Sequence, residues 1–399
     1  MKKLLSKVKK HLSINLLFRK WYLPQVLKHG VFLTDHQERK DINQIKKIEN
    51  KKERITPFAE LIPIETSDLK DRFLSSHTYV NRDKYVYEIK NALLAGPYGL
   101  VCTSDKRLVR DTISFNGTGR VEPFLLNSYL KDSDWFKKFF IHQNWNSIKT
   151  HKDLQVGLSL CSVWINYFHW IVEELPKLRA LENYYEQTGI KPKIVIPSNE
   201  SPYIRESLKC MGYEIKKDTI SYQGKTIRLD KLIVQTFPEI TPELTEYIRN
   251  RVLKNLKLPL EESGSRRIYL SRDRAGNRNL TNKNEIMSLL KDYGFEEMYL
   301  EDLTFEQQVK LIHNSSVIVS CHSAGLTNII WGKELRVVEL FGHTIKTTYA
   351  RLCEARGHTY RAVAGEPVEA DHRSNFFIEK SKLETILSKI GINKRNTKK

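Results

Sequence analysis

Residues 318–328 read IVSCHSAGLTN, an apolar run typical of a buried strand that breaks abruptly into small and polar residues before helical character resumes. A strand that runs into a helix N-terminus in this way leaves free backbone N–H groups directed at one spot, and such a spot binds anions. Gly325 lets the backbone approach a ligand closely, while His322 and Ser323 add side-chain donors where the helix dipole favours a phosphate. An ordinary strand, turn and helix around a buried histidine is the alternative interpretation.

A second predicted strand, residues 266–270, delivers polar and cationic side chains to its carboxyl end. Ser271, Arg272 and Arg274 follow it at once, and a polar loop then leads to Arg278. Open α/β sheets bind ligands at this edge. The planar guanidinium group of arginine matches phosphate oxygens better than the point charge of lysine does. These residues therefore predict a diphosphate clamp, with a solvated charged loop as the alternative.

Several ordered motifs occur between residues 160 and 345. They are NYFHW at 166–170 with Glu173 and Pro176 after it, SRD at 271–273, YLEDL at 299–303, Phe305, QV at 308–309 and VVELF at 337–341. Together they resemble glycosyltransferase family 61, in particular its bacterial polysaccharide-biosynthesis members. The resemblance implies an inverting enzyme of the GT-B type, in which two Rossmann-like domains face a cleft and the donor is a nucleotide sugar. The family commonly shows Pro-His-Gly-Ala-Gly in the anion loop, whereas Cys321 and Ser323 replace its Pro and first Gly here.

The helix predicted over residues 165–181 carries Asn166, His169 and Glu173 on one face. His169 and Glu173 lie four residues apart and can share a proton, so the pair can be tuned to abstract one near neutral pH. The resemblance places an acidic residue at the position of Glu173, which makes Glu173 our first choice of catalytic base. His169 is the second choice or the orienting partner, and Asn166 supports the acceptor side. A satisfied pair in an aromatic core is the alternative.

Four more residues complete the expected donor site. Ala324 lies in the anion loop, and Thr327 and Asn328 in the turn after it are either phosphate contacts or helix caps. Glu339 ends a predicted strand and either accepts hydrogen bonds from the ribose hydroxyls or serves as a structural carboxylate. Because guanidinium groups and a helix dipole can replace a divalent ion at a diphosphate, we expect no metal and no cofactor besides the donor substrate.

The region between residues 57 and 150 offers one candidate metal motif, Asp132-Ser133-Asp134. No apolar strand precedes it, and it lies in a polar run, so we interpret it as a surface loop. Five cysteines are scattered without metal-ligand spacing, which indicates neither a disulfide framework nor a zinc site and favours a reducing cytoplasm.

Length and periodicity predict two domains. A chain of 399 residues with 40% hydrophobic content is long enough for two cores. Strands and helices alternate twice, over 151–250 and over 267–341, and Val/Ile-rich strands in that pattern favour parallel sheets. The first alternation predicts a helix at 163–185, a strand at 193–197, a helix at 202–211, a strand at 231–235 and a helix at 242–256.

The resulting division has four parts. A basic amphipathic segment and linker occupies 1–56, and the acceptor-side domain occupies 57–256, with a β-rich lead-in at 57–150 and a Rossmann-like part at 151–256. The nucleotide-sugar-binding domain occupies 257–390, and a basic tail occupies 391–399.

The net charge of +19 is concentrated at the two ends of the chain. Residues 1–56 carry +10 and residues 391–399 carry +4, which leaves +5 for residues 57–390. A nucleic-acid enzyme usually has its basic stripe on the folded face, so we exclude that class. Residues 1–28 mix lysines with apolar side chains partly at helical spacing, which predicts a helix on an anionic membrane surface or, alternatively, a solvated helix or linker.

Together these features predict an α/β, GT-B-like, metal-independent inverting glycosyltransferase. It would move a sugar from a nucleoside diphosphate sugar to a glycan or lipid-linked glycan in capsular or other surface polysaccharide synthesis. We expect it in the bacterial cytoplasm, peripheral on the inner face of the membrane and without a nucleic-acid partner. The alternative is a membrane-attached scaffold that binds a nucleotide or glycan without turnover.

Overall fold

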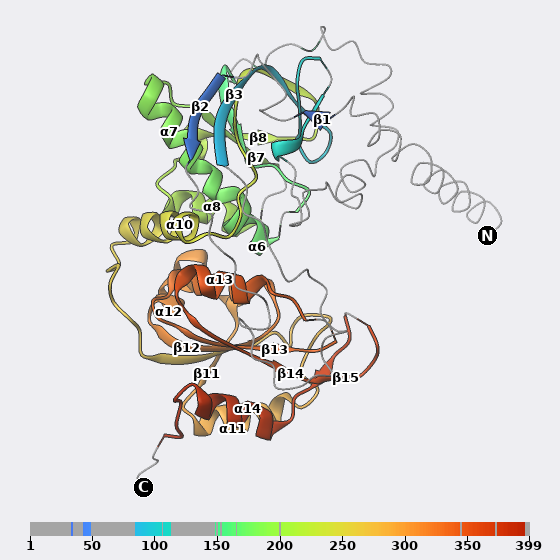
Figure 1. The fold of residues 1–399 in the computed structure, drawn as a ribbon, viewed down its shortest axis with the longest axis vertical. Coiled ribbons are helices and arrows are strands. Elements are labelled where there is room, and N and C mark those ends of the chain that lie inside the picture. Colours follow the sequence, from blue (N-terminus) through green and yellow to red (C-terminus); the bar gives the residue numbers. More distant parts are fainter. Residues whose placement is uncertain are drawn as a thin grey trace, which may run out of the picture.

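The computed structural model describes residues 33–34, 43–48, 84–105, 107–112, 148, 151, 154–164, 166–198, 201–343, 345–371 and 373–395. The predicted membrane segment 1–28, most of the linker to residue 56 and the Asp132-Ser133-Asp134 run lie outside these residues. The described chain forms a nine-stranded sheet, a five-stranded sheet and a two-stranded ribbon, and the two large sheets lie one above the other in Figure 1.

The first sheet is mixed. Its strand order is β1-β5-β4-β3-β9-β6-β7-β8, with β2 paired to β3. Strands β6 to β9 run parallel to one another, whereas β3 lies antiparallel to β9. The strands are β1 (Leu33–Thr34), β2 (Asn43–Ile48), β3 (Lys84–Ala95), β4 (Leu100–Cys102), β5 (Leu108–Val109), β6 (Val156–Ser159), β7 (Lys193–Pro197), β8 (Thr219–Tyr222) and β9 (Ile227–Gln235).

Strand β3 joins two parts that the sequence pattern separates. We expected a β-rich lead-in before the Rossmann-like part, but β3 pairs with β9 from Val86 opposite Gln235 to Leu94 opposite Ile227. Val86 and Tyr87 point to opposite faces of the sheet, and both are fully buried. A strand buried on both faces belongs inside a sheet, which explains why β3 is incorporated. The parallel arrangement expected for residues 151–250 is present in β6 to β9, whereas β3 adds antiparallel pairs with β4 and β9.

The second sheet is parallel throughout, as predicted. Its order is β11-β10-β12-β13-β14. Its strands are β10 (Arg266–Leu270), β11 (Glu296–Met298), β12 (Ser315–Cys321), β13 (Arg336–Phe341) and β14 (Thr359–Ala364), and the ribbon comprises β15 (Glu366–Pro367) and β16 (Phe376–Phe377).

Helices cover both faces of the second sheet. Val319 and Val338 pack in a cluster with α11 and α14, whereas Ile318 and Val337 pack in a cluster with α12 and α13. This alternation is the period of two expected for a strand buried on both sides. The helices and helical turns are η3 (Arg110–Thr112), α6 (Tyr167–His169), η6 (Trp170–Glu174), η7 (Leu175–Lys177), α7 (Leu178–Thr188), α8 (Pro202–Cys210), α9 (Ile215–Asp218), α10 (Pro242–Asn255), α11 (Lys283–Asp292), η8 (Leu300–Asp302), α12 (Phe305–His313), η9 (Ala324–Trp331), α13 (Thr348–Arg356) and α14 (Lys380–Lys389).

The two halves share one hydrophobic cluster. It contains Ile233 of β9 and Val252 of α10 together with Phe305 of α12 and Trp331 of η9. Helix α8 packs against α12, and α10 packs against α13, in the layer between the sheets (Figure 1). The buried Arg249 on α10 donates to the Trp331 carbonyl oxygen at 3.4 Å. The layer between the sheets is therefore a packed core.

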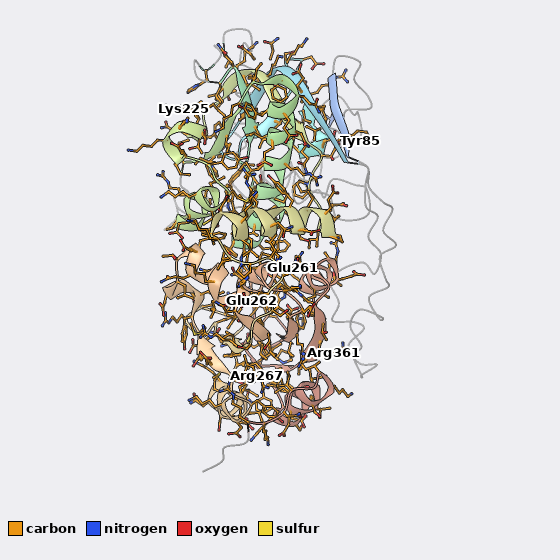
Figure 2. The ribbon with its side chains drawn as sticks, turned by 90° about the vertical axis from the view of Figure 1, so that its left-hand side faces the viewer. Tyr85, Lys225, Glu261, Glu262, Arg267 and Arg361 are labelled. Carbon is orange, nitrogen blue, oxygen red and sulfur yellow. The ribbon has the colours of Figure 1, made fainter. Side chains whose placement is uncertain are left out.

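The chain passes from the first half to the second through residues 256–265, close to the predicted boundary. Figure 2 shows Glu261 and Glu262 on this connection. At the other end, Ile392 is 2% exposed and packs with α11 and α14, so the first residues of the expected basic tail belong to the fold. Within the described ranges, no helix is both long and apolar enough to cross a membrane.

Candidate functional site

The helix that carries the expected base begins at Tyr167, later than the predicted start at Val163. Asn166 is its N-cap, with extended backbone at φ −74° and ψ 165°, and its Oδ1 accepts a hydrogen bond from the His169 backbone N–H at 3.3 Å. A cap of this kind satisfies an N–H group that the first helical turn leaves free. Asn166, which we expected to support the acceptor, therefore has a capping role that helical periodicity does not reveal.

His169 and Glu173 form the pair that their spacing predicts. His169 Nδ1 lies 2.6 Å from Glu173 Oε2, and the side chains are 23% and 14% exposed. The His169 ring stacks on Trp164, with centroids 5.5 Å apart and planes 23° apart. With Nδ1 held by the carboxylate, the second ring nitrogen, Nε2, remains to exchange a proton with a ligand. The pair is thus both fixed in orientation and accessible to solvent.

A π-helical turn, η6, places Glu173 and Glu174 in different environments. Such turns are rare and often lie at functional sites. Glu173 is partly exposed, whereas Glu174 is 1% exposed and its Oε2 accepts a hydrogen bond from Lys177 Nζ at 2.7 Å. Burial raises the pKa of Glu174, and the charge of Lys177 opposes that effect. Simple helical periodicity missed this second pair.

The anion loop has the predicted position between β12 and a helix. His322 and Ser323 connect β12 to η9, which is a 3₁₀-helix and has Ser323 as its N-cap residue with extended backbone. Ala324 is the first helical residue. A Cβ added to Gly325 would lie 2.9 Å from Leu300 Cδ1, closer than side-chain atoms normally approach. The glycine therefore allows η8 to pack tightly against the loop.

His322 is held by a buried carboxylate. Its Nδ1 forms a short hydrogen bond with Glu339 Oε1, and the Tyr360 hydroxyl donates to Glu339 Oε2 at 2.5 Å. Glu339 is fully buried. Both carboxylate oxygens bind groups of the protein, so these contacts do not support the predicted ribose contact of Glu339. The alternative, a structural carboxylate, is the one that the structure supports.

The cationic side chains of the predicted clamp divide into two groups. Arg272 bonds to the carbonyl and side-chain oxygens of Asn277 at 3.0 to 3.2 Å. Arg274 instead forms an exposed ion pair with Asp302 at 2.6 Å and lies over the Tyr299 ring. The prediction that Arg274 faces the anion loop is therefore not supported by its contacts, since a neighbouring carboxylate engages it on the surface.

Arg272, Arg278 and Lys346 form a cationic cluster. The pKa of Arg272 lies below its usual value because burial desolvates its guanidinium group and because Arg278 adds a like charge. Lys346 is exposed, and its pKa is lowered by partial desolvation and by the like charge of Arg278. Like charges that crowd together and lose solvent favour binding of an anion. Lys346 was missed at the sequence level because it stands alone, outside any motif.

The remaining predicted donor contacts are buried. Asn328 is fully buried, and its Oδ1 accepts from the Tyr167 hydroxyl at 2.7 Å and from Trp331 Nε1 at 2.9 Å. Its amide nitrogen donates to Gly325 O and to Gln308 Oε1, both at 3.1 Å. These four bonds use the side chain within the protein, so a phosphate contact is excluded for Asn328 in this arrangement.

Two smaller residues complete the predicted set. Thr327 is fully buried, and its hydroxyl lies close to the Tyr349 side chain without a well-formed hydrogen bond. The Ser271 hydroxyl donates to Asp273 Oδ1 at 3.1 Å, so Ser271 shapes the start of the loop that carries Arg272.

Aromatic rings connect the His169 pair to the anion loop. Phe168 meets His169 edge to face at a centroid distance of 5.2 Å and meets Tyr349 at 5.9 Å. Tyr349 in turn lies 5.4 Å from His322. The charges of Arg272 and Arg278 lie close enough to the Tyr349 hydroxyl to oppose the rise in its pKa that burial causes. The fold thus brings the two predicted chemical signals, more than 150 residues apart, to one place.

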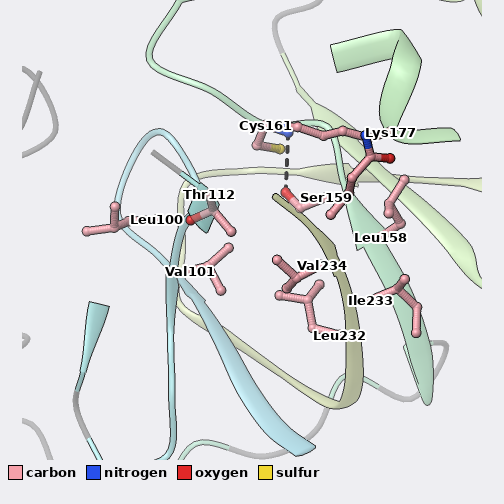
Figure 3. Close-up of a pocket in the computed structure, with 12 residues that line it drawn as sticks. Leu100, Val101, Thr112, Leu158, Ser159, Cys161, Lys177, Leu232, Ile233 and Val234 are labelled. Carbon is pink, nitrogen blue, oxygen red and sulfur yellow. Dashed lines mark hydrogen bonds between the residues drawn. The ribbon is translucent and has the colours of Figure 1, made fainter. Parts of the chain in front are cut away.

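A narrow pocket in the first half, lined in part by Lys177 of η7, has room for little more than water. Figure 3 shows Ser159 and Cys161 at the carboxyl end of β6, with Lys177 beside them. Gln235 also lines the pocket, is 2% exposed, and has both amide atoms buried without a hydrogen-bond partner. Such a buried amide favours a ligand or water that both donates and accepts.

Comparison with known proteins adds two findings. Residues 167–338 match the family described as Glycosyltransferase 61. A stretch of 117 residues is 29% identical to the EGF domain-specific O-linked N-acetylglucosamine transferase of Gallus gallus, and it covers 27% of this chain and 22% of that protein. The chain therefore spans about a fifth of the length of that relative.

Proposed function

We propose, on the support that both comparisons give to glycosyltransferase family 61, that this protein moves a sugar from a nucleoside diphosphate sugar to a glycan acceptor. One observation carries the proposal. The Phe168 and Tyr349 rings connect the His169 and Glu173 pair to the anion loop. Arg272 and Arg278 lie close to Tyr349 at the same place. A base and an anion site are the two elements that sugar transfer from a diphosphate donor requires. Incubation with a panel of nucleotide sugars, scored for hydrolysis and transfer, tests it.

The proposed mechanism is inverting and of the GT-B type. The His169 and Glu173 pair removes the proton of the acceptor hydroxyl, which then attacks the anomeric carbon from the face opposite the leaving diphosphate. The bond to the diphosphate breaks as the new glycosidic bond forms, so the configuration inverts. Arg272, Arg278 and Lys346 stabilise the charge that develops on the leaving group.

Metal independence is part of the proposal. Three cationic side chains and the loop N–H groups are available to balance a diphosphate. Because these groups can balance the charge of the diphosphate, activity should persist in EDTA. Loss on chelation, followed by recovery with Mn²⁺ or Mg²⁺, would contradict this assignment.

The acceptor is proposed to bind on the first half. Lys177 lines the pocket of Figure 3 and bonds to Glu174, which adjoins the expected base Glu173 in the chain. The unpartnered Gln235 amide suits a bound water, which would extend its hydrogen bonds to a hydroxyl or amide group of the acceptor. Gln235→Leu should raise the KM for the acceptor and leave the affinity for a nucleoside diphosphate unchanged.

The biological setting is a second level of the proposal. The sequence resemblance to bacterial polysaccharide-biosynthesis members suggests capsule or surface-polysaccharide synthesis at the inner membrane face, with residues 1–28 as the membrane contact. Deletion of residues 1–28 should release the protein from anionic vesicles, and high salt should weaken the binding of the full chain. Equal sedimentation of both proteins with vesicles would place the contact elsewhere.

A non-catalytic scaffold that binds a nucleotide or glycan is the second candidate function. The bonding of Glu339 and Asn328 within the protein is the observation that favours it, because both side chains were expected at the donor and instead bind other groups of the protein. Nucleotide binding without any hydrolysis or transfer across the donor panel would support the scaffold over the enzyme.

A further inference from the structure

His322 is the end of a three-residue chain of hydrogen bonds that starts inside the second sheet. Tyr360 on β14 donates to Glu339 Oε2 at 2.5 Å, and Glu339 Oε1 on the adjacent strand β13 bonds to His322 Nδ1. The His322 ring also stacks on Phe341, with centroids 5.4 Å apart and planes 24° apart. Its orientation is therefore set by bonding at one edge and stacking on one face.

Because Glu339 is buried, a negative charge on its carboxylate requires a nearby partner. Its side chain is 0% exposed, and within the part of the chain that the structure describes, the ion-pairing group next to it is His322. A carboxylate in such an environment is stable when charged only if it is hydrogen-bonded and paired with a cation. Glu339 therefore favours a protonated imidazole, with the proton on Nδ1 directed to Oε1 and the proton on Nε2 available to a ligand.

Cationic side chains lie close to Tyr349, the α13 residue whose ring packs against His322. Arg272 and Arg278 come from the loop after β10, and Lys346, just before α13, adds a further cation close to Arg278. An anion bound among these cations would place negative charge near the His322 ring and would favour a doubly protonated imidazole.

We propose that binding of a nucleoside diphosphate at the anion loop is coupled to uptake of one proton from solvent at His322 Nε2, with Glu339 and Tyr360 as positioning residues. In the bound state the Nε2–H donates to a diphosphate oxygen, and the Nδ1–H remains on Glu339. During transfer the same N–H stabilises the departing diphosphate. The inference rests on the proposed function for the identity of the ligand, but it adds a proton and a positioning role for Glu339 and Tyr360.

Proton linkage gives the direct test. Each of UDP, GDP, ADP and CDP is titrated into the full chain by calorimetry, and those that bind are repeated near pH 7 in two buffers of different protonation enthalpy. The number of protons taken up follows from the difference in apparent enthalpy. The wild-type protein should take up a positive fraction of a proton, and its affinity should therefore fall as pH rises.

Three variants locate the proton. His322→Asn should abolish uptake, and Glu339→Gln, which keeps the size of the side chain but removes its charge, should nearly abolish it and lower affinity about tenfold or more. Tyr360→Phe removes one hydroxyl from the chain and should reduce uptake partly, which keeps the test decisive if Glu339→Gln does not fold. Glu296→Gln is the matched control, because Glu296 is exposed on the edge strand β11, where it pairs with Arg266 of β10.

The outcomes separate this inference from the proposed function. If no nucleoside diphosphate binds the folded wild-type protein, the donor site itself is wrong. If a diphosphate binds without proton uptake, or if uptake persists in His322→Asn, the donor site stands and the proton coupling is overturned. Thermal melts of every variant establish that the compared proteins are folded.

Discussion

The Tyr167 hydroxyl donates a hydrogen bond to Asn328 Oδ1 at 2.7 Å, which joins the first turn of the helix bearing the expected base to the 3₁₀-helix of the anion loop. Asn328 also donates to the carbonyl oxygen of Gly325 in that loop. Burial raises the pKa of Tyr167 well beyond its usual range, so the hydroxyl remains a donor at any working pH. The position of the base and the shape of the anion loop are therefore linked through one side chain.

Tyr167→Phe tests that link. Removal of one neutral buried hydrogen bond should cost roughly 1 kcal/mol of folding free energy, and more if Asn328 is left without a partner. We expect kcat to fall several-fold, because the helix that carries His169 and Glu173 is no longer hydrogen-bonded to Asn328 next to the anion loop. The affinity for a nucleoside diphosphate should change little. Steady-state kinetics and a thermal melt would measure both. An unchanged kcat in a destabilised protein would reduce Tyr167 to a packing residue.

Arg272 and Arg274 should behave differently although both belong to the motif at the end of β10. Arg272→Ala should weaken binding of a nucleoside diphosphate by about 1.5 to 3 kcal/mol, the range for a lost charged hydrogen bond. Arg274→Ala should have a much smaller effect, since its exposed ion pair with Asp302 engages it away from the cationic cluster. Calorimetry on both variants decides. Equal losses would return Arg274 to the donor site.

Glu173→Gln should lower transfer by about 10²-fold or more, because the amide keeps the shape of the side chain but cannot share a proton with His169. His169→Ala should also lower transfer. Since the two side chains are 2.6 Å apart and act as a unit, the double variant should be little worse than the more damaged single variant. Turnover per folded molecule, measured beside the melting temperature, is the required quantity. Normal turnover of folded Glu173→Gln would move the base to another residue.

His358 should make the fold sensitive to acid. Burial lowers the pKa of His358 to about 4, and the imidazole accepts from the Leu335 backbone N–H at 3.2 Å while its other nitrogen bonds to Ile329 O at 3.0 Å. In the unfolded chain a histidine titrates near pH 6.5, at about its usual pKa. The unfolded state therefore binds more protons between these values, and stability falls as pH drops from about 6.5 towards 4.

The difference between the two pKa values of His358 limits the loss of unfolding free energy to roughly 3 kcal/mol. Urea unfolding at pH 7 and pH 5 should show the loss in the wild-type protein and a smaller loss in His358→Gln. Parallel pH profiles for the two proteins would assign the acid sensitivity to other groups.

The sequence was most informative where local chemistry and global packing agree. Strands 193–197 and 266–270 have the predicted bounds, because their Val, Ile and Leu side chains are buried and polar residues end them. The His169 and Glu173 pair followed from a spacing of four. The helix start at 163 was wrong because the cap at Asn166 overrides apolar periodicity.

The misses concern contacts that depend on distant partners. The sequence places Glu339 at the end of a strand whether it is a ribose contact or a structural carboxylate. The structure adds that one of its carboxylate oxygens bonds to His322 and the other to Tyr360 on the next strand. Lys346 joins the cationic cluster through the path of the loop before α13, which no local pattern encodes. Strand β3 enters the first sheet by long-range pairing with β9, and register of that kind is set by the whole fold.

The core shared by the two sheets has a consequence for cutting the protein into pieces. Residues 167–338 carry the family match, but an excised fragment with those ends would lose β3 and β6, the two neighbours of β9, and β14, a neighbour of β13. Strands that lose their neighbours in this way expose unpaired sheet edges, and such edges invite aggregation. A cut at the Glu261 and Glu262 connection has the opposite effect, because Phe305 and Trp331 could still pack against α8 and α10. Two separately expressed halves should therefore associate through this shared core.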